Sequence, residues 1–142
     1  MSTKLFRVED EALQDARVRA QSGDAFVLVL APGKFRFFST KEVLGFLSWT
    51  AVLGAGQERI DLDYGHDVPN GLHEFEARGR RVTYRAPDGK DYFGPTEGKI
   101  FLEVERPPTG TAFTHKGNFL NVRFESDGNT VVLNGGYKLS SS

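Results

Sequence analysis

The stretch HEFEARGRRVTYRAPDGKDY, residues 73–92, decides the expected fold, because polar and apolar residues alternate on both sides of turns that contain glycine. Such alternation is typical of strands with one buried and one solvated face. A two-residue loop at Gly79-Arg80 places Phe75 opposite Tyr84 on the apolar face. A slip of one residue would exchange the two faces, so the pattern also sets the register. The stretch therefore predicts an antiparallel hairpin.

The second turn of this stretch, Pro87-Asp88-Gly89, fits a three-residue loop, because glycine accepts the left-handed conformation that such loops need. With this loop, Tyr84 lies opposite Tyr92 and Arg85 lies opposite Asp91. An aromatic pair and an ion pair are both favourable across neighbouring strands. The hairpin is therefore expected to continue into a third antiparallel strand.

Similar short segments occur on both sides of this stretch. ERIDLDY, residues 58–64, alternates apolar and charged residues, and KIFLEVE, residues 99–105, directs Ile100, Leu102 and Val104 to one face. Turn signals separate such segments at intervals of about 8–12 residues, which is typical of an antiparallel sandwich or barrel.

The C-terminal part contains three further turn signals. We expect loops at Lys116-Gly117, at Asp127-Gly128 and at Asn134-Gly135-Gly136, the last leading into a short strand over residues 137–139. With these loops the apolar residues share one face, which consists of Phe113, Leu120, Val122, Phe124, Val131 and Leu133. Residues 140–142 are expected to fray.

The N-terminal part is expected to begin with a helix and a hairpin. Acidic residues at the start and apolar residues at three- and four-residue spacing predict a helix over residues 9–21. AFVLVLA, residues 25–31, lacks alternation and is typical of a strand buried on both faces. Pro32-Gly33 suits a type II turn, so FRFF, residues 35–38, forms the return strand of a hairpin over residues 25–38.

A second helix is expected over residues 40–53. Ser39-Thr40-Lys41-Glu42 has the sequence of a capping box, whose first and last side chains satisfy each other's backbone amides. Phe38 can pack against Val43 as a hydrophobic staple, and Gly54 ends the segment. The apolar residues of this segment surround the helix axis, so the helix is expected to be largely covered.

Length and composition agree with one folded domain. The chain has 142 residues, of which 39% are hydrophobic and 26% charged, too apolar for a disordered chain. We expect a single α+β domain, mainly antiparallel β, that forms a sandwich or a partly open barrel-like meander with two helices near the N-terminus. Residues 1–56 form its helix-hairpin-helix portion, residues 57–139 its β-meander portion, and residues 140–142 a frayed tail.

Charge and cysteine content exclude several classes of protein. The chain carries 18 basic and 19 acidic residues and no cysteine, which excludes disulfides and thiolate metal sites. The basic cluster has acidic neighbours that neutralise it, and it consists of Arg78, Arg80, Arg81 and Arg85. No nucleic-acid partner is therefore expected.

The sequence predicts no membrane segment. The longest stretch without a charged residue, residues 43–57, is shorter than the ~20 residues that a helix needs to cross a bilayer. The first twenty residues lack the apolar core of a secretory leader. With no cysteine in the chain, we expect a cytoplasmic protein that does not enter membranes.

A group of acidic residues and a histidine forms one candidate site. Oxygen atoms of Asp61, Asp63 and Asp67, with a nitrogen of His66, are groups that bind divalent cations. They suggest a hydrolase or metal enzyme centred on residues 61–73 as one alternative function. The match to a calcium loop is poor, and a solvated polar face is the simpler interpretation.

A small-ligand-binding β-barrel or sandwich is another alternative. The side chains that could line its cavity are Trp49, His73, Tyr84 and Tyr92. No nucleophile motif accompanies the histidines, so we assign no catalytic residue and expect no cofactor.

Two aromatic residues do not follow the apolar pattern of their strands. Phe101 and Phe119 lie on the sides opposite the apolar faces, where the second helix covers them or they form an exposed surface. An exposed surface of this kind would bind a partner. Paired strands with well-defined turns, many loops and the lack of a catalytic set favour a non-catalytic binding or protein-interaction module. Its partner is expected to be an unknown protein or a second copy of the chain in a homo-oligomer.

Overall fold

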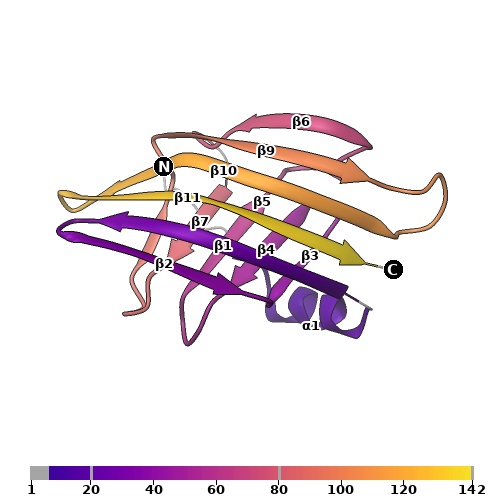
Figure 1. The fold of residues 1–142 in the computed structure, drawn as a ribbon, viewed down its shortest axis with the longest axis horizontal. Coiled ribbons are helices and arrows are strands. Elements are labelled where there is room, and N and C mark those ends of the chain that lie inside the picture. The colour runs from indigo at the N-terminus through magenta and orange to yellow at the C-terminus, as the bar shows by residue number, and fades with distance from the viewer. Residues whose placement is uncertain (1–6, 20, 80, 142) are drawn as a thin grey trace.

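The fold consists of two antiparallel β-sheets around one core, with a short helix near the N-terminus (Figure 1). The structure is a computed structural model that describes residues 7–19, 21–79 and 81–141. In spatial order, the first sheet contains β2 (Lys34–Thr40), β1 (Gln21–Ala31), β11 (Asn129–Ser141), β10 (Phe113–Ser126), β9 (Glu97–Glu105) and β6 (Gly71–Glu76). The second contains β3 (Val43–Phe46), β4 (Trp49–Leu53), β5 (Arg59–Asp63), β7 (Arg81–Arg85) and β8 (Asp91–Phe93).

Neither sheet closes into a barrel within the described ranges. The first sheet ends at β2 and β6, and the second ends at β3 and β8. β5 and β7 belong to the second sheet, whereas β6, which lies between them in the sequence, belongs to the first. The strands therefore do not form the single meander that the sequence predicted. The mainly antiparallel fold is confirmed. The described residues form one helix instead of two, and it is not long and apolar enough to cross a membrane.

The hydrophobic core lies between the facing sides of the two sheets. Ile100, Leu102 and Val104 of β9 point into it, as predicted, and pack in one cluster with Ile60 and Leu62 of β5. Burial of the apolar residues on the facing sides supplies the main driving force for association of the sheets.

A chain of buried hydroxyl groups crosses this core. Tyr64, which follows β5, shares hydrogen bonds with Thr50 of β4 at 2.7 Å and with Tyr137 of β11 at 2.6 Å. Burial raises the pKa of Tyr64 to about 12, so the hydroxyl stays protonated at neutral pH. Because buried polar groups need partners, these bonds join the two sheets at a defined position.

Helix α1 (Asp10–Val18) covers part of the outer face of the second sheet. Leu13 packs there against Leu44 and Ala51, in a small cluster separate from the main core. The helix is shorter than predicted, because β1 already begins at Gln21.

Three of the predicted turns are confirmed. β1 and β2 pair around Pro32-Gly33, β7 and β8 pair around Pro87-Asp88-Gly89, and β10 and β11 pair around Asp127-Gly128. The predicted partners of these strands, including Tyr84 with Tyr92 and Phe124 with Val131, lie opposite each other. Each turn carries a glycine with positive φ, which short hairpin loops require.

The predicted helix over residues 40–53 is wrong, because this segment forms the hairpin β3–β4. Thr40 Oγ1 accepts a hydrogen bond from the Glu42 amide at 3.0 Å and donates to the Leu53 carbonyl at 2.7 Å. The segment Ser39-Thr40-Lys41-Glu42, which we expected to cap a helix, therefore closes a turn between two strands. The segment is apolar on all sides because both faces of its strands are covered. One face packs in the core, and α1 covers part of the other.

The predicted hairpin around Gly79-Arg80 is also wrong. Phe75 of β6 pairs with Ile100 in the first sheet, whereas Tyr84 of β7 pairs with Ile60 in the second. Both aromatic side chains are buried in the same core, but on opposite sheets. Alternation shows which face of a strand is buried and does not identify the neighbouring strand. Arg80 lies outside the described residues.

The turns expected at Lys116-Gly117 and Asn134-Gly135-Gly136 are absent, because β10 and β11 run through them without a break. Gly117 lies opposite Tyr137, and a Cβ atom at Gly117 would overlap the tyrosine ring. The glycine therefore serves close packing instead of a turn. Residues 140 and 141 pair with β1 and β10 as part of β11 instead of fraying, and Ser142 lies outside the described range.

A β-bulge in β10 changes which residues face the core. The register with β11 shifts between Phe119 and Val122, and Asn121 adopts φ of 52°. An extra residue in one strand reverses the alternation beyond it. Phe119 is therefore buried, and Leu120, which we expected on the apolar face, is exposed.

Candidate interaction surface

Part of the outer face of β1, from Phe26 to Leu30, is apolar and accessible to solvent. Ala25, Val27 and Val29 point into the core, as the alternation of an antiparallel strand requires. The residues between them, Phe26, Leu28 and Leu30, point to the opposite face. The prediction that residues 25–31 are buried on both faces is therefore wrong within the described chain, where Phe26 is 54% exposed.

Strand β2 adds two exposed phenylalanines beside these residues. Phe35 is 65% exposed and Phe37 is 59% exposed. The register places Phe37 beside Leu28, and the rings of Phe37 and Phe26 stack with centroids 5.4 Å apart. The hairpin thus carries a continuous aromatic surface.

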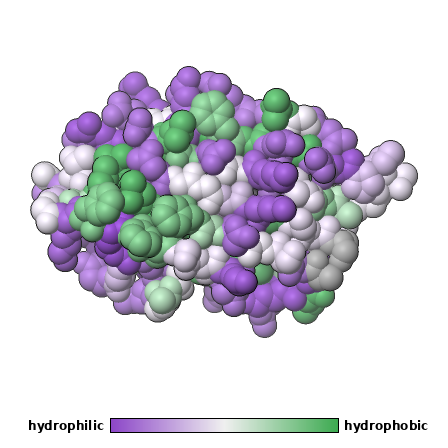
Figure 2. Space-filling view, in the orientation of Figure 1, coloured by the Kyte–Doolittle hydropathy of each residue, from purple (hydrophilic) through white to green (hydrophobic). Residues whose placement is uncertain are grey.

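These side chains and one neighbour on β11 form a surface that we call the β1–β2 patch. Val132 joins it because it lies beside Leu30 in the register of β1 and β11. The patch contains no charged residue and consists of Phe26, Leu28, Leu30, Phe35, Phe37 and Val132. Figure 2 shows hydrophobic residues gathered on this face of the molecule, over the end where β1 and β2 meet.

An ion pair on the other side of β2 holds the hairpin in place. Arg36 points away from the patch and donates to the Glu58 carboxylate, with an Nη2–Oε1 distance of 2.9 Å. Glu58 is 3% exposed and also accepts a hydrogen bond of 2.6 Å from the Tyr84 hydroxyl. Burial and the Glu58 contact raise the pKa of Tyr84 well above its usual value. β2 is therefore fixed to the second sheet, and the patch is presented on a rigid element.

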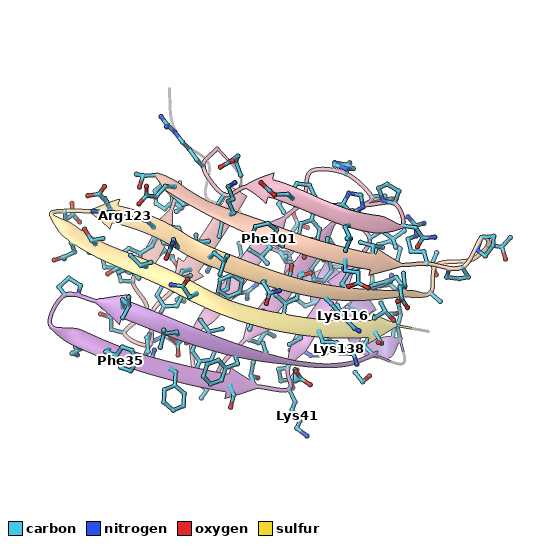
Figure 3. All side chains as sticks on the ribbon, turned by 45° about the horizontal axis from the view of Figure 1, so that its top comes forward. Phe35, Lys41, Phe101, Lys116, Arg123 and Lys138 are labelled. Atoms are coloured by element: carbon cyan, nitrogen blue, oxygen red, sulfur yellow. The ribbon has the colours of Figure 1, made fainter. Side chains whose placement is uncertain are left out.

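The rest of the same sheet face carries charged residues, and the exposed Leu120 and the half-buried Phe101 lie among them. Leu30 pairs with Val132 of β11, Val132 pairs with Arg123 of β10, and Arg123 pairs with Glu97 of β9. Figure 3 shows Phe35 and Arg123 toward the same end of the sheet and Phe101 nearer its middle. The β1–β2 patch thus lies at one corner of this face.

The two phenylalanines predicted as an interaction surface do not form one. Phe119 is 1% exposed and packs near Tyr137 in the core, where the bulge directs it. Phe101 is half-buried on the outer face, beside Asn118 and Glu74 in the register. The two rings therefore lie on opposite faces of the sheet.

The residues proposed to line a ligand cavity are also separated. Tyr84 and Tyr92 stack in the core with ring centroids 6.0 Å apart. Trp49 packs with the cluster beneath α1, on the other face of the second sheet. His73 belongs to the first sheet, where its Nε2 lies 2.7 Å from the Pro69 carbonyl oxygen. These four side chains do not share a cavity.

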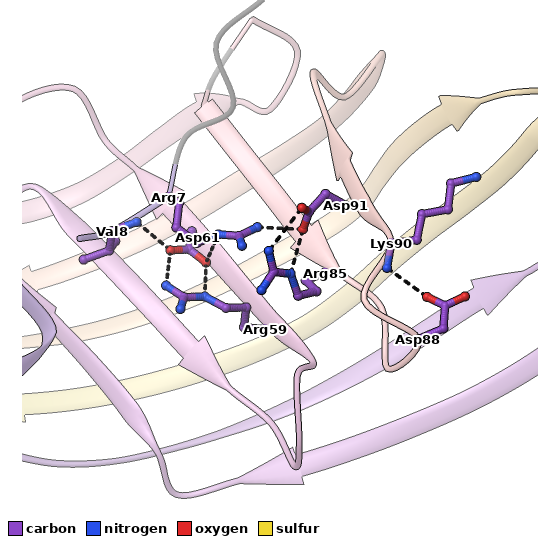
Figure 4. A network of polar contacts seen from close by, with 8 residues as sticks. All are labelled: Arg7, Val8, Arg59, Asp61, Arg85, Asp88, Lys90 and Asp91. Carbon is purple, nitrogen blue, oxygen red and sulfur yellow. Dashed lines mark hydrogen bonds and ion pairs between the residues drawn. The ribbon is translucent and has the colours of Figure 1, made fainter. Parts of the chain in front are cut away.

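Asp61, a candidate metal ligand, is buried and fully occupied by other groups. Its carboxylate accepts two hydrogen bonds from Arg59, at 2.7 and 2.6 Å, and one from the Val8 amide at 2.8 Å (Figure 4). The prediction that it lies on a solvated face is wrong, because the N-terminal segment covers it. Asp63 accepts a bond from the Gly65 amide.

The other two candidates, His66 and Asp67, are exposed. In the part of the chain that the structure describes, no three acidic or histidine side chains form a metal-binding group.

The polar network around Asp61 continues to Asp91. Arg7 donates to Asp91 at 2.7 Å and Arg85 donates at 2.9 and 3.2 Å. Partial burial raises the pKa of Asp91, but the bonds from Arg85 and Arg7 outweigh it and hold the pKa below its usual value. The network attaches the residues before α1 to the second sheet, which is a structural role.

His115 is the one fully buried histidine among the described residues. Its ring lies against Phe113 and Tyr64, with centroids 4.5 and 5.9 Å away, and neither nitrogen has a hydrogen-bond partner there. Burial, with a smaller effect of Arg106, lowers its pKa from 6.5 to about 4. The ring is therefore neutral at pH 7 and has no contact with solvent through which to act as a base.

Comparison of the chain with protein-family models, curated proteins and solved structures finds no match. Function is therefore inferred from the surface itself. The β1–β2 patch was missed at the sequence level, although one signal was present. An apolar run such as residues 25–31 requires a cover on both faces, and the described chain provides a cover on only one.

Proposed function

We propose that the chain is a non-catalytic protein-interaction module that binds its partner through the β1–β2 patch. The observation that supports this is the exposure of Phe26, Phe35 and Phe37 together on one anchored hairpin. Large aromatic side chains on a rigid surface are typical of the residues that contribute most to protein binding. A single exposed apolar residue would need no explanation, but a contiguous group does.

The size of the patch fits this role. With about 200 Å² for each fully exposed phenylalanine, the patch exposes roughly 500 Å² of apolar surface. Burial of that area is worth about 12 kcal/mol at ~25 cal/mol per Å². Association costs about 4–15 kcal/mol in lost freedom of motion, so binding also requires contacts around the patch.

The small-ligand alternative finds less support. It requires Trp49 and Tyr84 beside a common cavity, whereas they lie on opposite faces of the second sheet. The metal-enzyme alternative requires a free carboxylate at Asp61, which instead accepts hydrogen bonds from Arg59 and the Val8 amide. We therefore propose the interaction module alone.

The test compares two double variants as bait in affinity purification. Phe35→Ser/Phe37→Ser removes the two most exposed side chains of the patch. Leu72→Ser/Phe93→Ser is the matched control, because these apolar residues are also exposed but lie on β6 and β8. The first variant is expected to lose a partner that the wild type and the control retain. Recovery of the same proteins with all three baits would contradict the proposal.

A further inference from the structure

We propose that the partner of the β1–β2 patch is a second copy of the same chain, packed patch against patch about a two-fold axis. This inference rests on the proposed function, because it identifies the protein that the patch binds. Three features of the surface favour a second copy: the absence of charge in the patch, its area, and the missing cover on β1.

The absence of charge suits a two-fold contact. In such an interface, residues near the axis meet their own copies, so a charged side chain there would face a like charge. The patch carries none, because Arg36 of β2 points to the other side and pairs with Glu58. The net charge of −1 also adds little repulsion between two copies.

The area of the patch is sufficient for a specific dimer. Two patches of roughly 500 Å² each bury about 1,000 Å² in total, near the lower limit for a specific interface. The neighbouring polar residues of β11 would add to this area at the rim. Sheets that pack face to face lie about 10 Å apart and bury the aligned side chains of both.

The third feature is the uncovered outer face of β1. Residues 25–31 of β1 have the composition of a strand that is buried on both faces, and the core covers one of them. On the second sheet, α1 supplies an outer cover through Leu13 and Ala16. The outer face of β1 receives no such cover from the described residues, and a second copy would provide an equivalent apolar surface.

The charged half of the sheet face sets the arrangement of the two copies. Arg123, Glu97 and Lys99 lie beyond the patch on β10 and β9, where burial would cost their hydration. We therefore place the two-fold axis within the patch, with the copies offset so that these charges stay in solvent. Leu28 lies at the centre of the contact in this arrangement, and Phe101 lies outside it.

Sedimentation velocity or light scattering on the purified full chain tests the inference. The wild type is expected to show a mass of twice 15.8 kDa that falls on dilution. Phe35→Ser/Phe37→Ser is expected to be monomeric at the same concentrations, and Leu72→Ser/Phe93→Ser to remain dimeric. Circular dichroism confirms that each variant is folded. A monomeric wild type, or a dimer that survives the patch variant, would overturn the inference.

Chemical cross-linking tests the geometry independently, because the chain contains no native cysteine. Leu28→Cys is expected to form a covalent dimer with a bismaleimide of about 10 Å, the spacing of packed sheets. Phe101→Cys is the matched control, since it is also half-buried on the same face but outside the contact. Equal cross-linking of both variants would overturn the face-to-face arrangement.

Failure of this inference can be told apart from failure of the proposed function. A monomeric wild type that still captures a different protein through Phe35 and Phe37 rejects the second copy and keeps the interaction module. A monomeric wild type whose captured proteins do not depend on these residues rejects both.

Discussion

The hydroxyl oxygens of Tyr64 and Tyr137 lie 2.6 Å apart, and this hydrogen bond joins the two sheets inside the core. Tyr64 also shares a hydrogen bond with Thr50, so its oxygen is the central member of a buried chain. Removal of one hydroxyl leaves its partner buried without a hydrogen bond, and this lowers the free energy of unfolding by more than the net contribution of the bond itself.

Tyr64→Phe is therefore expected to lower the free energy of unfolding by about 1–3 kcal/mol, as measured by urea denaturation. Tyr137→Phe should cost less, because Tyr64 keeps its bond to Thr50. The double variant should cost less than the sum of the two, since both changes remove the same bond. Strictly additive costs would show that the two hydroxyls do not interact.

His115 is expected to make the fold sensitive to acid. Its pKa is about 4 in the folded chain, against 6.5 when exposed, so the unfolded state binds its proton first as the pH falls. The free energy of unfolding should fall from pH 6.5 and lose up to about 3 kcal/mol by pH 4 from this residue.

Chemical denaturation over this pH range measures the effect. His115→Phe should have a flatter stability profile than the wild type, because it removes the group whose pKa differs between the folded and unfolded states. Identical slopes for His115→Phe and the wild type would show that His115 does not cause the pH dependence.

Asp61→Asn is expected to destabilise the fold by about 3 kcal/mol, because it removes the charge that Arg59 and the Val8 amide bind in a buried position. Thermal or urea unfolding gives the value. Asp67→Asn, a change of the same kind at an exposed site, should stay within about 0.5 kcal/mol of the wild type. Equal effects of the two substitutions would contradict the role of Asp61.

Gly117→Ala is expected to cost more than about 1 kcal/mol, because the added methyl group would overlap the ring of Tyr137. Gly128→Ala is a useful comparison, since Gly128 has positive φ but open space around it. Tyr137→Leu should partly rescue Gly117→Ala and leave Gly128→Ala unimproved. Urea denaturation of the three single and two double variants checks this, and the absence of any rescue would contradict the packing explanation.

Three of the six expected turns could be predicted from the local sequence. Pro32-Gly33, Pro87-Asp88-Gly89 and Asp127-Gly128 each occur where the structure has a hairpin loop, because proline and glycine act on the backbone of their own turn. The register around these loops followed from the same residues.

Features that depend on distant segments could not be predicted. Nothing near Phe75 indicates that its strand pairs with Ile100, and nothing near Gly117 indicates that Tyr137 fills the space beside it. The bulge after Phe119 also reverses alternation without a glycine or proline within it. The candidate surface was missed for the same reason, since exposure of Phe26 depends on which segments cover β1.

The position of β11 between β1 and β10 has a consequence for biosynthesis. Leu30 pairs with Val132, so the inner edge of the first hairpin has no neighbour until every intervening strand has left the ribosome. Pairing between segments so far apart in sequence is slow, and unpaired edges are prone to aggregate meanwhile. The inner edge of this hairpin therefore stays unpaired until β11 has been synthesised.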